Sequence, residues 1–294
     1  MTVLHSLYAG LIAPFVAYDF MARALVATLA LAAGCGPVGV LLVLRRMSLV
    51  GDAMSHAILP GAAVGFLIGG LSLPAMSLGG FGAGLAVATL SGLVARATEQ
   101  REDASFASFY LISLALGVLL VSTRGGNVDL LHVLFGTVLA VDDAALILVT
   151  SIASVTLLTL AVIYRPLVVE CFDPGFLRAV GGGGGATHLT FLVLVVLNLV
   201  GGFQALGTLL AVGLMMLPAT AARFWVRELW SMALVAFAIA FASGWLGLVV
   251  SFWFNLPSGP AIILAAGVFY LLSLVAGIRG SLLVRLLPGR HRAA

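Results

Sequence analysis

Apolar runs long enough to cross a membrane recur along almost the whole chain, and short connections carrying arginine separate them. About 20 apolar residues in a helix span the hydrocarbon core of a bilayer, with about 17 as the lower limit. Backbone N–H and C=O groups in lipid must be bonded within their own segment, so these runs predict helices. The candidate spans are 19–44, 53–70, 74–96, 105–122, 144–164, 188–203, 206–222, 230–252 and 258–279.

The composition excludes a soluble domain. Of the 294 residues, 62% are hydrophobic and 9% are charged, and the mean hydropathy is +1.22. Soluble domains are about 45–50% apolar and about a quarter charged. We therefore predict an all-α polytopic membrane protein with about eight or nine transmembrane helices. Its parts are an amphipathic lead-in over 1–18, a transmembrane domain over 19–285 and a cytoplasmic tail over 286–294, and we expect no cleavable signal peptide.

The arginines predict the orientation of the chain. Nine spans place twelve of the 14 arginines on one side, leaving only Arg23 and Arg124 on the other. Because cytoplasmic loops are enriched in basic residues, this side is the cytoplasm and the N-terminus faces outward. The count depends on 188–222, which we read as two short helices broken near Gly207. The segment 125–141 is short for a span, and we expect it to be re-entrant, packed against protein.

The absence of lysine excludes several activities. All 14 basic residues are arginine, so the chain has neither the lysine of a Walker A phosphate loop nor a lysine for Schiff-base chemistry. If ATP drives a process here, another subunit must hydrolyse it. An intramembrane hydrolase is disfavoured because neither a His-Glu-x-x-His nor a Gly-x-Ser-x-Gly element is present. The arginines lie at the ends of apolar segments, which indicates topology rather than nucleic-acid binding.

One carboxylate and one imidazole stand out within the apolar segments. Asp52 and His56 are four residues apart, which places them on one face of a helix. Polar groups at membrane depth are costly and usually functional, and this pair is a plausible ligand set for zinc or manganese. A hydrogen bond between the two side chains, or a capping role, is the structural alternative. We expect helix to run on from Arg46, with His56 roughly 15 Å above the cytoplasmic boundary, and Pro60 to stop or kink it.

The cytoplasmic stretch after the fifth span combines a helix-start signal with a run of glycines. Residues 170–180 precede the five glycines of 181–185, and Asp173 with Pro174 forms a good helix start. This pattern predicts a short helix over about 170–180, tethered by a glycine hinge. An ordinary interhelical loop and a docking helix for a soluble partner are both consistent with it.

Five ordered blocks of sequence resemble the permease subunits of metal-ion ABC importers, the zinc, manganese and iron uptake family. The first block runs from Leu44-Arg45-Arg46-Met47-Ser48 through Gly51-Asp52 to Ser55-His56-Ala57. The others are the segment from Val128-Asp129-Leu130-Leu131 to Val141, the Phe172-Asp173-Pro174 loop, the segment from Gly207-Thr208-Leu209-Leu210 to Arg223, and Leu256-Pro257-Ser258-Gly259-Pro260-Ala261. Together they cover roughly residues 19–279.

The resemblance implies a transport subunit rather than an enzyme, in the bacterial cytoplasmic (inner) membrane. Such permeases form a homodimer around a central path, bind two cytoplasmic ATP-binding subunits, and receive metal from a periplasmic or lipoprotein metal-binding protein. The metal is cargo, and no permanently bound cofactor is expected. The family's metal site maps onto Asp52 and His56. Its coupling region, which sits on the ATPase, maps onto the stretch that contains Glu170, Phe172, Asp173 and Arg178.

Some questions stay open from the sequence. One chain supplies two ligands, so we expect a two-fold axis to bring together two aspartates and two histidines. The motifs favour zinc over manganese as cargo. His132 is a possible second gate, although an interfacial histidine explains it as well, and His188 needs no functional role. The alternative function is a secondary transporter or channel in which Asp52 and His56 relay protons or cations, and it would have no use for a docking helix.

Overall fold

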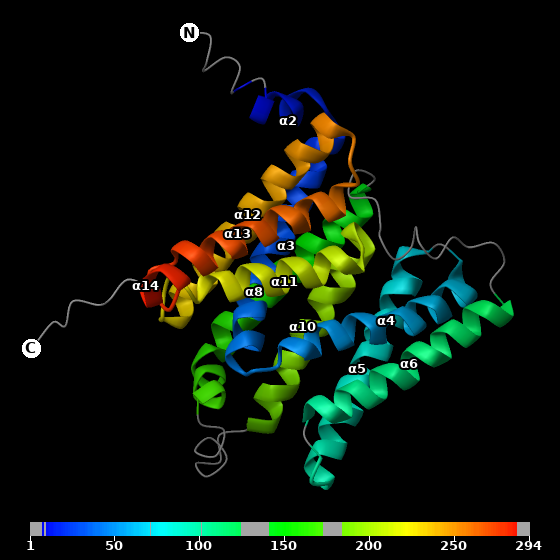
Figure 1. The fold of residues 1–294 in the computed structure, drawn as a ribbon. Helices are drawn as coiled ribbons and strands as arrows, with labels where there is room; N and C mark the ends of the chain where they lie inside the picture. The colour runs from blue at the N-terminus through cyan, green and yellow to red at the C-terminus, as the bar shows by residue number, and fades with distance from the viewer. Residues whose placement is uncertain are drawn as a thin grey trace, which may run out of the picture.

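The computed structural model describes residue 8 and residues 10–70, 72–100, 102–124, 141–172 and 184–286, and every regular element within these ranges is a helix. The all-α prediction is therefore confirmed (Figure 1). The helices are α2 (Ala13–Ala17), α3 (Asp19–Leu44), α4 (Ser48–Gly69), α5 (Leu73–Ala97), α6 (Glu102–Arg124), α8 (Asp143–Phe172), α10 (Gly184–Leu206), α11 (Thr208–Ala222), α12 (Leu229–Phe254), α13 (Ser258–Ala276) and α14 (Leu282–Leu286).

Eight of these helices are long and apolar enough to cross a membrane: α3, α4, α5, α6, α8, α10, α12 and α13. The segment 188–222 forms two helices, as predicted, and the break is at Gly207, whose φ of 93° suits glycine. The second of them, α11, has 15 residues, which gives a length of about 22 Å against a hydrocarbon core of about 30 Å. It is therefore short for a complete crossing.

Helix α3 lies at the centre of the bundle and runs parallel to α8. Arg23 and Asp143 form an exposed ion pair of 3.1 Å near the first residues of the two helices, and Arg45 and Glu170 form a buried pair of 2.7 Å at their other ends. The two arginines are 22 positions apart, which corresponds to about 33 Å of helix, close to one hydrocarbon thickness. The two ion pairs are thus separated by about one hydrocarbon thickness, with Arg45 on the arginine-rich side.

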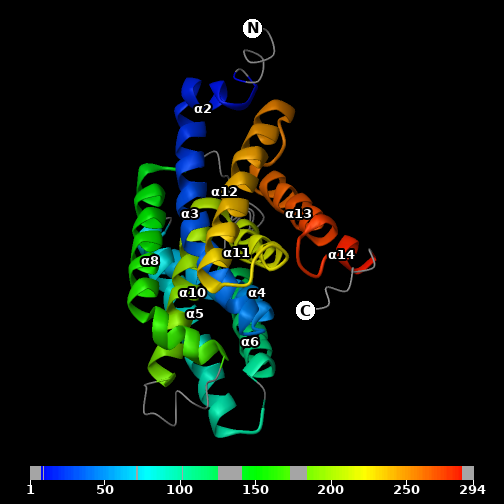
Figure 2. The same ribbon diagram turned by 90° about the vertical axis from the view of Figure 1, so that its left-hand side faces the viewer.

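The helix ends gather at two opposite ends of the bundle. In both views the last turns of α8, the first turns of α10 and the connection between α5 and α6 lie at the bottom, while α2 and the turn from α12 to α13 lie at the top (Figures 1 and 2). The indole N–H of Trp253, near the end of α12, donates a hydrogen bond of 2.9 Å to the carbonyl of Gly10. This bond ties the described part of the lead-in to the outer end of the bundle.

Asn198 is a buried polar residue that connects helices within the bundle. Its side chain is buried in α10, and Nδ2 donates hydrogen bonds of 2.8 Å to Thr156 Oγ1 on α8 and to the carbonyl of Leu194. Its Oδ1 lies against Gly34 of α3, where a Cβ atom would clash. Asn198 therefore bridges three helices.

Helix α8 is longer than predicted. It continues through Pro166 to Phe172 rather than ending near residue 164, because membrane helices tolerate a proline whose lost hydrogen bond is compensated locally. Glu170 and Phe172 therefore belong to the last turn of α8 and not to a separate short helix. Asp173, Arg178 and the rest of 173–183 lie outside the described residues, as do His132 within 125–140 and the tail from residue 287.

Helices α4, α5 and α6 gather at the lower right of Figure 1. Close approach of α4 to α5 depends on Gly61 and Gly79, each of which faces the other's backbone carbonyl with no room for a Cβ atom. Small residues at such contacts are the usual way for membrane helices to pack closely. This packing holds one side of α4 firmly and leaves another side for the functional site.

We predict that Gly61→Val destabilises the protein by about 1–3 kcal/mol through overpacking against α5. Thermal unfolding of the purified protein in detergent measures the effect. Gly82→Val on α5 is the matched control, because a Cβ atom there meets nothing within 4 Å. Equal unfolding temperatures for the two variants would mean that the α4–α5 contact is not as close as described.

Candidate functional site

The site begins with a sharp turn between α3 and α4. The N–H of Arg46 donates to the carbonyl of Val43 at 3.2 Å, and the N–H of Met47 donates to that of Leu42 at 2.9 Å. This pattern is a Schellman motif, in which glycine normally occupies the left-handed position. Here Arg46 occupies it, with φ of 59°. The helix therefore does not run on from Arg46 as predicted, and α4 starts afresh at Ser48.

One face of α4 remains uncovered. The side chains of Leu49, Asp52, His56, Leu59 and Ala63 are exposed or half-buried, while most neighbouring positions in the first four turns are buried. Their spacing of three and four residues makes a continuous stripe along the helix. Asp52 is 64% exposed and His56 is 41% exposed. A carboxylate and an imidazole thus lie on the open face of an apolar helix, about 6 and 12 Å from its start at 1.5 Å per residue.

The distance between the two side chains suits a shared ligand better than a mutual bond. His56 Nε2 lies 3.9 Å from Asp52 Oδ1, which is too long for a hydrogen bond. The structural alternative of a direct bond between them is therefore not formed. A tetrahedral ion with bonds of about 2.0–2.2 Å needs a donor separation of about 3.4 Å, so a small rotation of either side chain accommodates one ion between them.

Helix α6 packs against α4 beside His56, and Pro60 lies one turn further along α4. The ring of Tyr110 lies 6.1 Å from that of His56, centroid to centroid. Ser113 donates a weak hydrogen bond of 3.3 Å to the carbonyl of Ala57. Pro60 lies inside α4, which continues to Gly69, so of the two expectations for Pro60, a stop or a kink, the stop is wrong. Because proline has no N–H, the carbonyl of His56 loses its helical partner and is free to accept another donor.

A second polar cluster is buried at the cytoplasmic ends of three helices. Arg45 at the end of α3 and Glu170 near the end of α8 pair at 2.7 Å, with side chains only 8% and 7% exposed. His188 Nδ1, from the start of α10, lies 3.7 Å from the same carboxylate. The Arg45 guanidinium also lies 4.9 Å above the ring of Phe191. We call these four residues the buried cluster.

The buried cluster changes the role expected for Glu170 among the coupling residues. Glu170 directs its carboxylate inward to Arg45, so its part in coupling would be to hold the end of α8 rather than to touch a partner. Phe172 is 73% exposed two residues later, which leaves its side chain free for a contact. Sequence reasoning treated Arg45 as a topology marker and His188 as a boundary residue. The structure shows that Arg45 and His188 both contact the carboxylate of Glu170. This could not be predicted, because the three residues come from helices that are far apart in the sequence.

The described residues contain no group of three or more His, Cys, Asp or Glu side chains that could hold a metal ion. Asp52 and His56 are two candidate donors, the number that the sequence predicts for one chain. Tyr110 is the neighbour that sequence reasoning missed, because its place beside His56 depends on the packing of α6 against α4.

Comparison with known proteins gives consistent matches over almost the whole chain. A family model described as "ABC 3 transport family" matches residues 17–277. The manganese import system permease protein ScaB of Streptococcus parasanguinis is 32% identical over 256 residues, covering 87% of this chain and 90% of that protein. The manganese transport system membrane protein MntC of Listeria monocytogenes is 31% identical, covering 90% and 94%. The chelated iron transport system membrane protein YfeD of Yersinia pestis is 30% identical, covering 92% and 90%.

Solved structures agree. PsaBC from Streptococcus pneumoniae, in complex with Fab, matches with a TM-score of 0.81 at 30% identity, covering 92% of this chain and 96% of that one. An inward-facing putative metal-chelate type ABC transporter matches with a TM-score of 0.68 at 15% identity, and this likeness shows the fold alone.

We predict that Glu170→Gln destabilises the protein by about 3–5 kcal/mol, because it leaves the Arg45 charge buried without a counter-ion. Chemical unfolding in detergent measures the loss. Arg23→Gln breaks the exposed pair with Asp143 and serves as the control, with an expected loss of at most about 1 kcal/mol. The double variant Arg45→Met with Glu170→Leu should recover most of the stability. Equal losses in Glu170→Gln and Arg23→Gln would contradict the burial of the cluster.

Proposed function

The chain belongs to the ABC 3 transport family, and we propose that it is the membrane permease of an ATP-driven importer of a divalent transition metal. Its membrane-spanning helices and its relatives place it in the cytoplasmic membrane as a multi-pass protein. Its relatives bear the names of import and transport systems for manganese and iron. These names favour an importer over the secondary transporter or channel that the sequence left as an alternative.

The observation that carries the proposal is the pair Asp52 and His56 on the uncovered face of α4. Exposing a carboxylate and an imidazole to hydrocarbon is costly, so this face meets water or protein. A carboxylate oxygen and an imidazole nitrogen are ligands suited to manganese, iron and zinc. The separation of 3.9 Å leaves space for one ion between them.

A second copy of the chain is the proposed partner for this face. Two copies related by a two-fold axis would present two carboxylates and two imidazoles, enough for a tetrahedral site or part of a larger shell. The stripe from Leu49 to Ala63 supplies the apolar surround of such an interface. ATP-binding subunits on the cytoplasmic side and a metal-binding delivery protein outside complete the proposed importer. Hydrolysis is assigned to the ATP-binding subunits because this chain has no lysine for a phosphate loop.

The identity of the metal is the finer question. The sequence motifs favoured zinc, whereas the relatives above are named for manganese and chelated iron. Affinity rises from manganese through iron towards zinc at most nitrogen and oxygen sites, so a site that must carry manganese achieves it through geometry, coordination number or the delivery protein. We propose manganese as the first cargo to test, with zinc as the comparison.

Coupling to ATP hydrolysis is proposed at the cytoplasmic end of α8. Phe172 offers an exposed aromatic side chain there, and Asp173 and Arg178 follow it in the chain. Arg45 connects this end to the metal site, because it pairs with Glu170 and stands three residues before α4. A displacement of the end of α8 would thus be transmitted to α4 through the ion pair of Glu170 with Arg45 and through the tight turn at Arg46.

We predict that Asp52→Ala and His56→Ala each abolish metal uptake while membrane insertion stays normal, since each variant removes one of the two ligands. Manganese and zinc uptake into vesicles containing the permease with its ATP-binding subunits measures the effect. Asp143→Asn is the matched control, because that carboxylate is 73% exposed near the start of α8 and pairs with Arg23.

The metal content of the purified complex, measured by mass spectrometry, shows whether Asp52 and His56 act as metal ligands or as a gate. Wild type should retain manganese or zinc, and the Asp52→Ala/His56→Ala variant should lose it. Wild-type uptake in both single variants would rule out the site. Retained metal with lost uptake would make the pair a gate instead.

We predict that Phe172→Ala uncouples ATP hydrolysis from uptake, raising the ATP consumed per ion several-fold while metal content is unchanged. The ratio of phosphate released to metal accumulated in vesicles measures this. Val162→Ala on the same helix, 81% exposed, is the control for loss of a surface side chain. An unchanged ratio in Phe172→Ala would place coupling elsewhere.

A further inference from the structure

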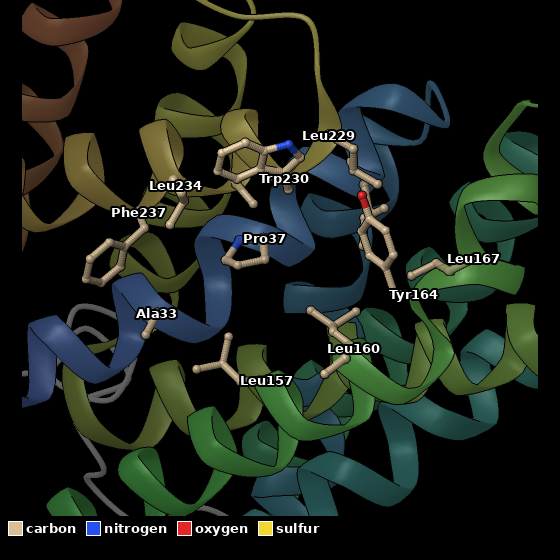
Figure 3. Close-up of a pocket in the computed structure, with 13 residues that line it drawn as sticks. Ala33, Pro37, Leu157, Leu160, Tyr164, Leu167, Leu229, Trp230, Leu234 and Phe237 are labelled. Carbon is tan, nitrogen blue, oxygen red and sulfur yellow. The ribbon is translucent and has the colours of Figure 1, made fainter.

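A groove on the side of the bundle lies between α3, α8 and α12, apart from the α4 site (Figure 3). Its volume is about 490 Å³, and no residue of α4, α5 or α6 lines it. The lining side chains are apolar except for the hydroxyl of Tyr164 and the indole N–H of Trp230. A groove with so few polar groups is suited to a hydrocarbon ligand.

The groove has the length and depth of one membrane leaflet. Its lining runs from Ala33 to Leu41 on α3, from Leu157 to Leu167 on α8 and from Leu229 to Phe237 on α12. At 1.5 Å per residue these stretches are about 12–15 Å long, which is about half of a 30 Å hydrocarbon core. They are the cytoplasmic halves of α3 and α8, which end on the arginine-rich side, and of α12, which begins there.

The cytoplasmic mouth of the groove carries aromatic and basic residues. Trp230 and Tyr164 line this end of the groove, and Phe237 lies towards the other end (Figure 3). Tryptophan and tyrosine at such a level are typical of the boundary between hydrocarbon and headgroups. Arg165 follows Tyr164 directly, and Arg227 precedes Leu229 by two residues; both arginines are exposed.

The charge at this mouth is positive. Neither Arg165 nor Arg227 forms an ion pair within the described part of the chain. The neighbouring carboxylate of Glu228 accepts a hydrogen bond of 3.3 Å from Ser231 and offsets one of the two charges. A net positive mouth above an apolar groove matches an anionic headgroup above an acyl chain.

We propose that the groove binds one acyl chain of an anionic phospholipid from the cytoplasmic leaflet, with its phosphate held by Arg165 and Arg227. The proposal needs only the membrane location of the chain. It therefore stands or falls independently of the metal cargo.

Native mass spectrometry of the purified full-length protein, titrated with phosphatidylglycerol or phosphatidylcholine of identical chains, tests the proposal. Phosphatidylglycerol should bind more tightly. Arg165→Gln or Arg227→Gln should weaken it about fivefold and the double variant about thirtyfold, from a contribution near the membrane surface of about 1 kcal/mol for each arginine. Phosphatidylcholine binding should not change. Arg23→Gln, which removes an exposed arginine at the opposite end of α3, should have no effect.

Ala233→Trp fills the groove and should reduce binding of both lipids, whereas Val162→Trp, on an exposed position of α8 outside the groove, should not. Quenching of Trp230 fluorescence by phosphatidylglycerol with brominated chains, in a Trp225→Phe/Trp245→Phe/Trp253→Phe background, tests occupancy without altering the groove. Equal affinity for the two lipids, or equal effects of Arg23→Gln and Arg165→Gln, would reduce the contact to ordinary annular lipid and overturn the proposal. A change of oligomeric state in Ala233→Trp with unchanged lipid binding would assign the groove to a second copy instead.

Discussion

The cost of leaving a polar group unpartnered in hydrocarbon is the constraint on which the rest of this structure depends. It forces the described backbone into helices, and it leaves three acceptable places for side-chain charge. Charges lie beyond the hydrocarbon, as in the exposed pair of Arg23 and Asp143, or they are buried with a counter-ion, as in Arg45 and Glu170. The third place is a surface that another molecule completes, and we propose that Asp52 and His56 occupy it.

These three solutions are connected through α3. The exposed pair and the buried cluster join α3 to α8 at opposite ends, and the tight turn at Arg46 leads from the buried cluster directly into α4. The ligand pair therefore begins four residues inside a helix whose start is held by an ion pair. On its other sides α4 is held by glycine contacts with α5 and by Tyr110 and Ser113 of α6. A metal ion binding to the open face would meet a helix that is already positioned.

Several elements could be predicted from the sequence because they follow from local chemistry. Helix α3 has the predicted limits of 19–44, since an apolar run between Tyr18 and two arginines leaves little freedom, and the break at Gly207 follows from its glycine. Pro60 and Pro166 carry a local signal to end a helix and Arg46 carries a local signal to continue one, and in each case the surrounding residues override it. Both helices continue through their prolines, and a Schellman turn accepts arginine at a left-handed position at a cost of about 1–2 kcal/mol.

The sequence by itself determined that the chain is a helical membrane protein and that Asp52 and His56 share one helix face, because hydropathy and a spacing of four residues are local properties. Only the tertiary structure decided that this face is uncovered, that Glu170 turns inward to Arg45 and His188, and that α3, α8 and α12 leave a groove one leaflet long. Each of these depends on which helices pack together. That choice is made by shape and small-residue contacts between segments far apart in the chain, and no local pattern encodes it.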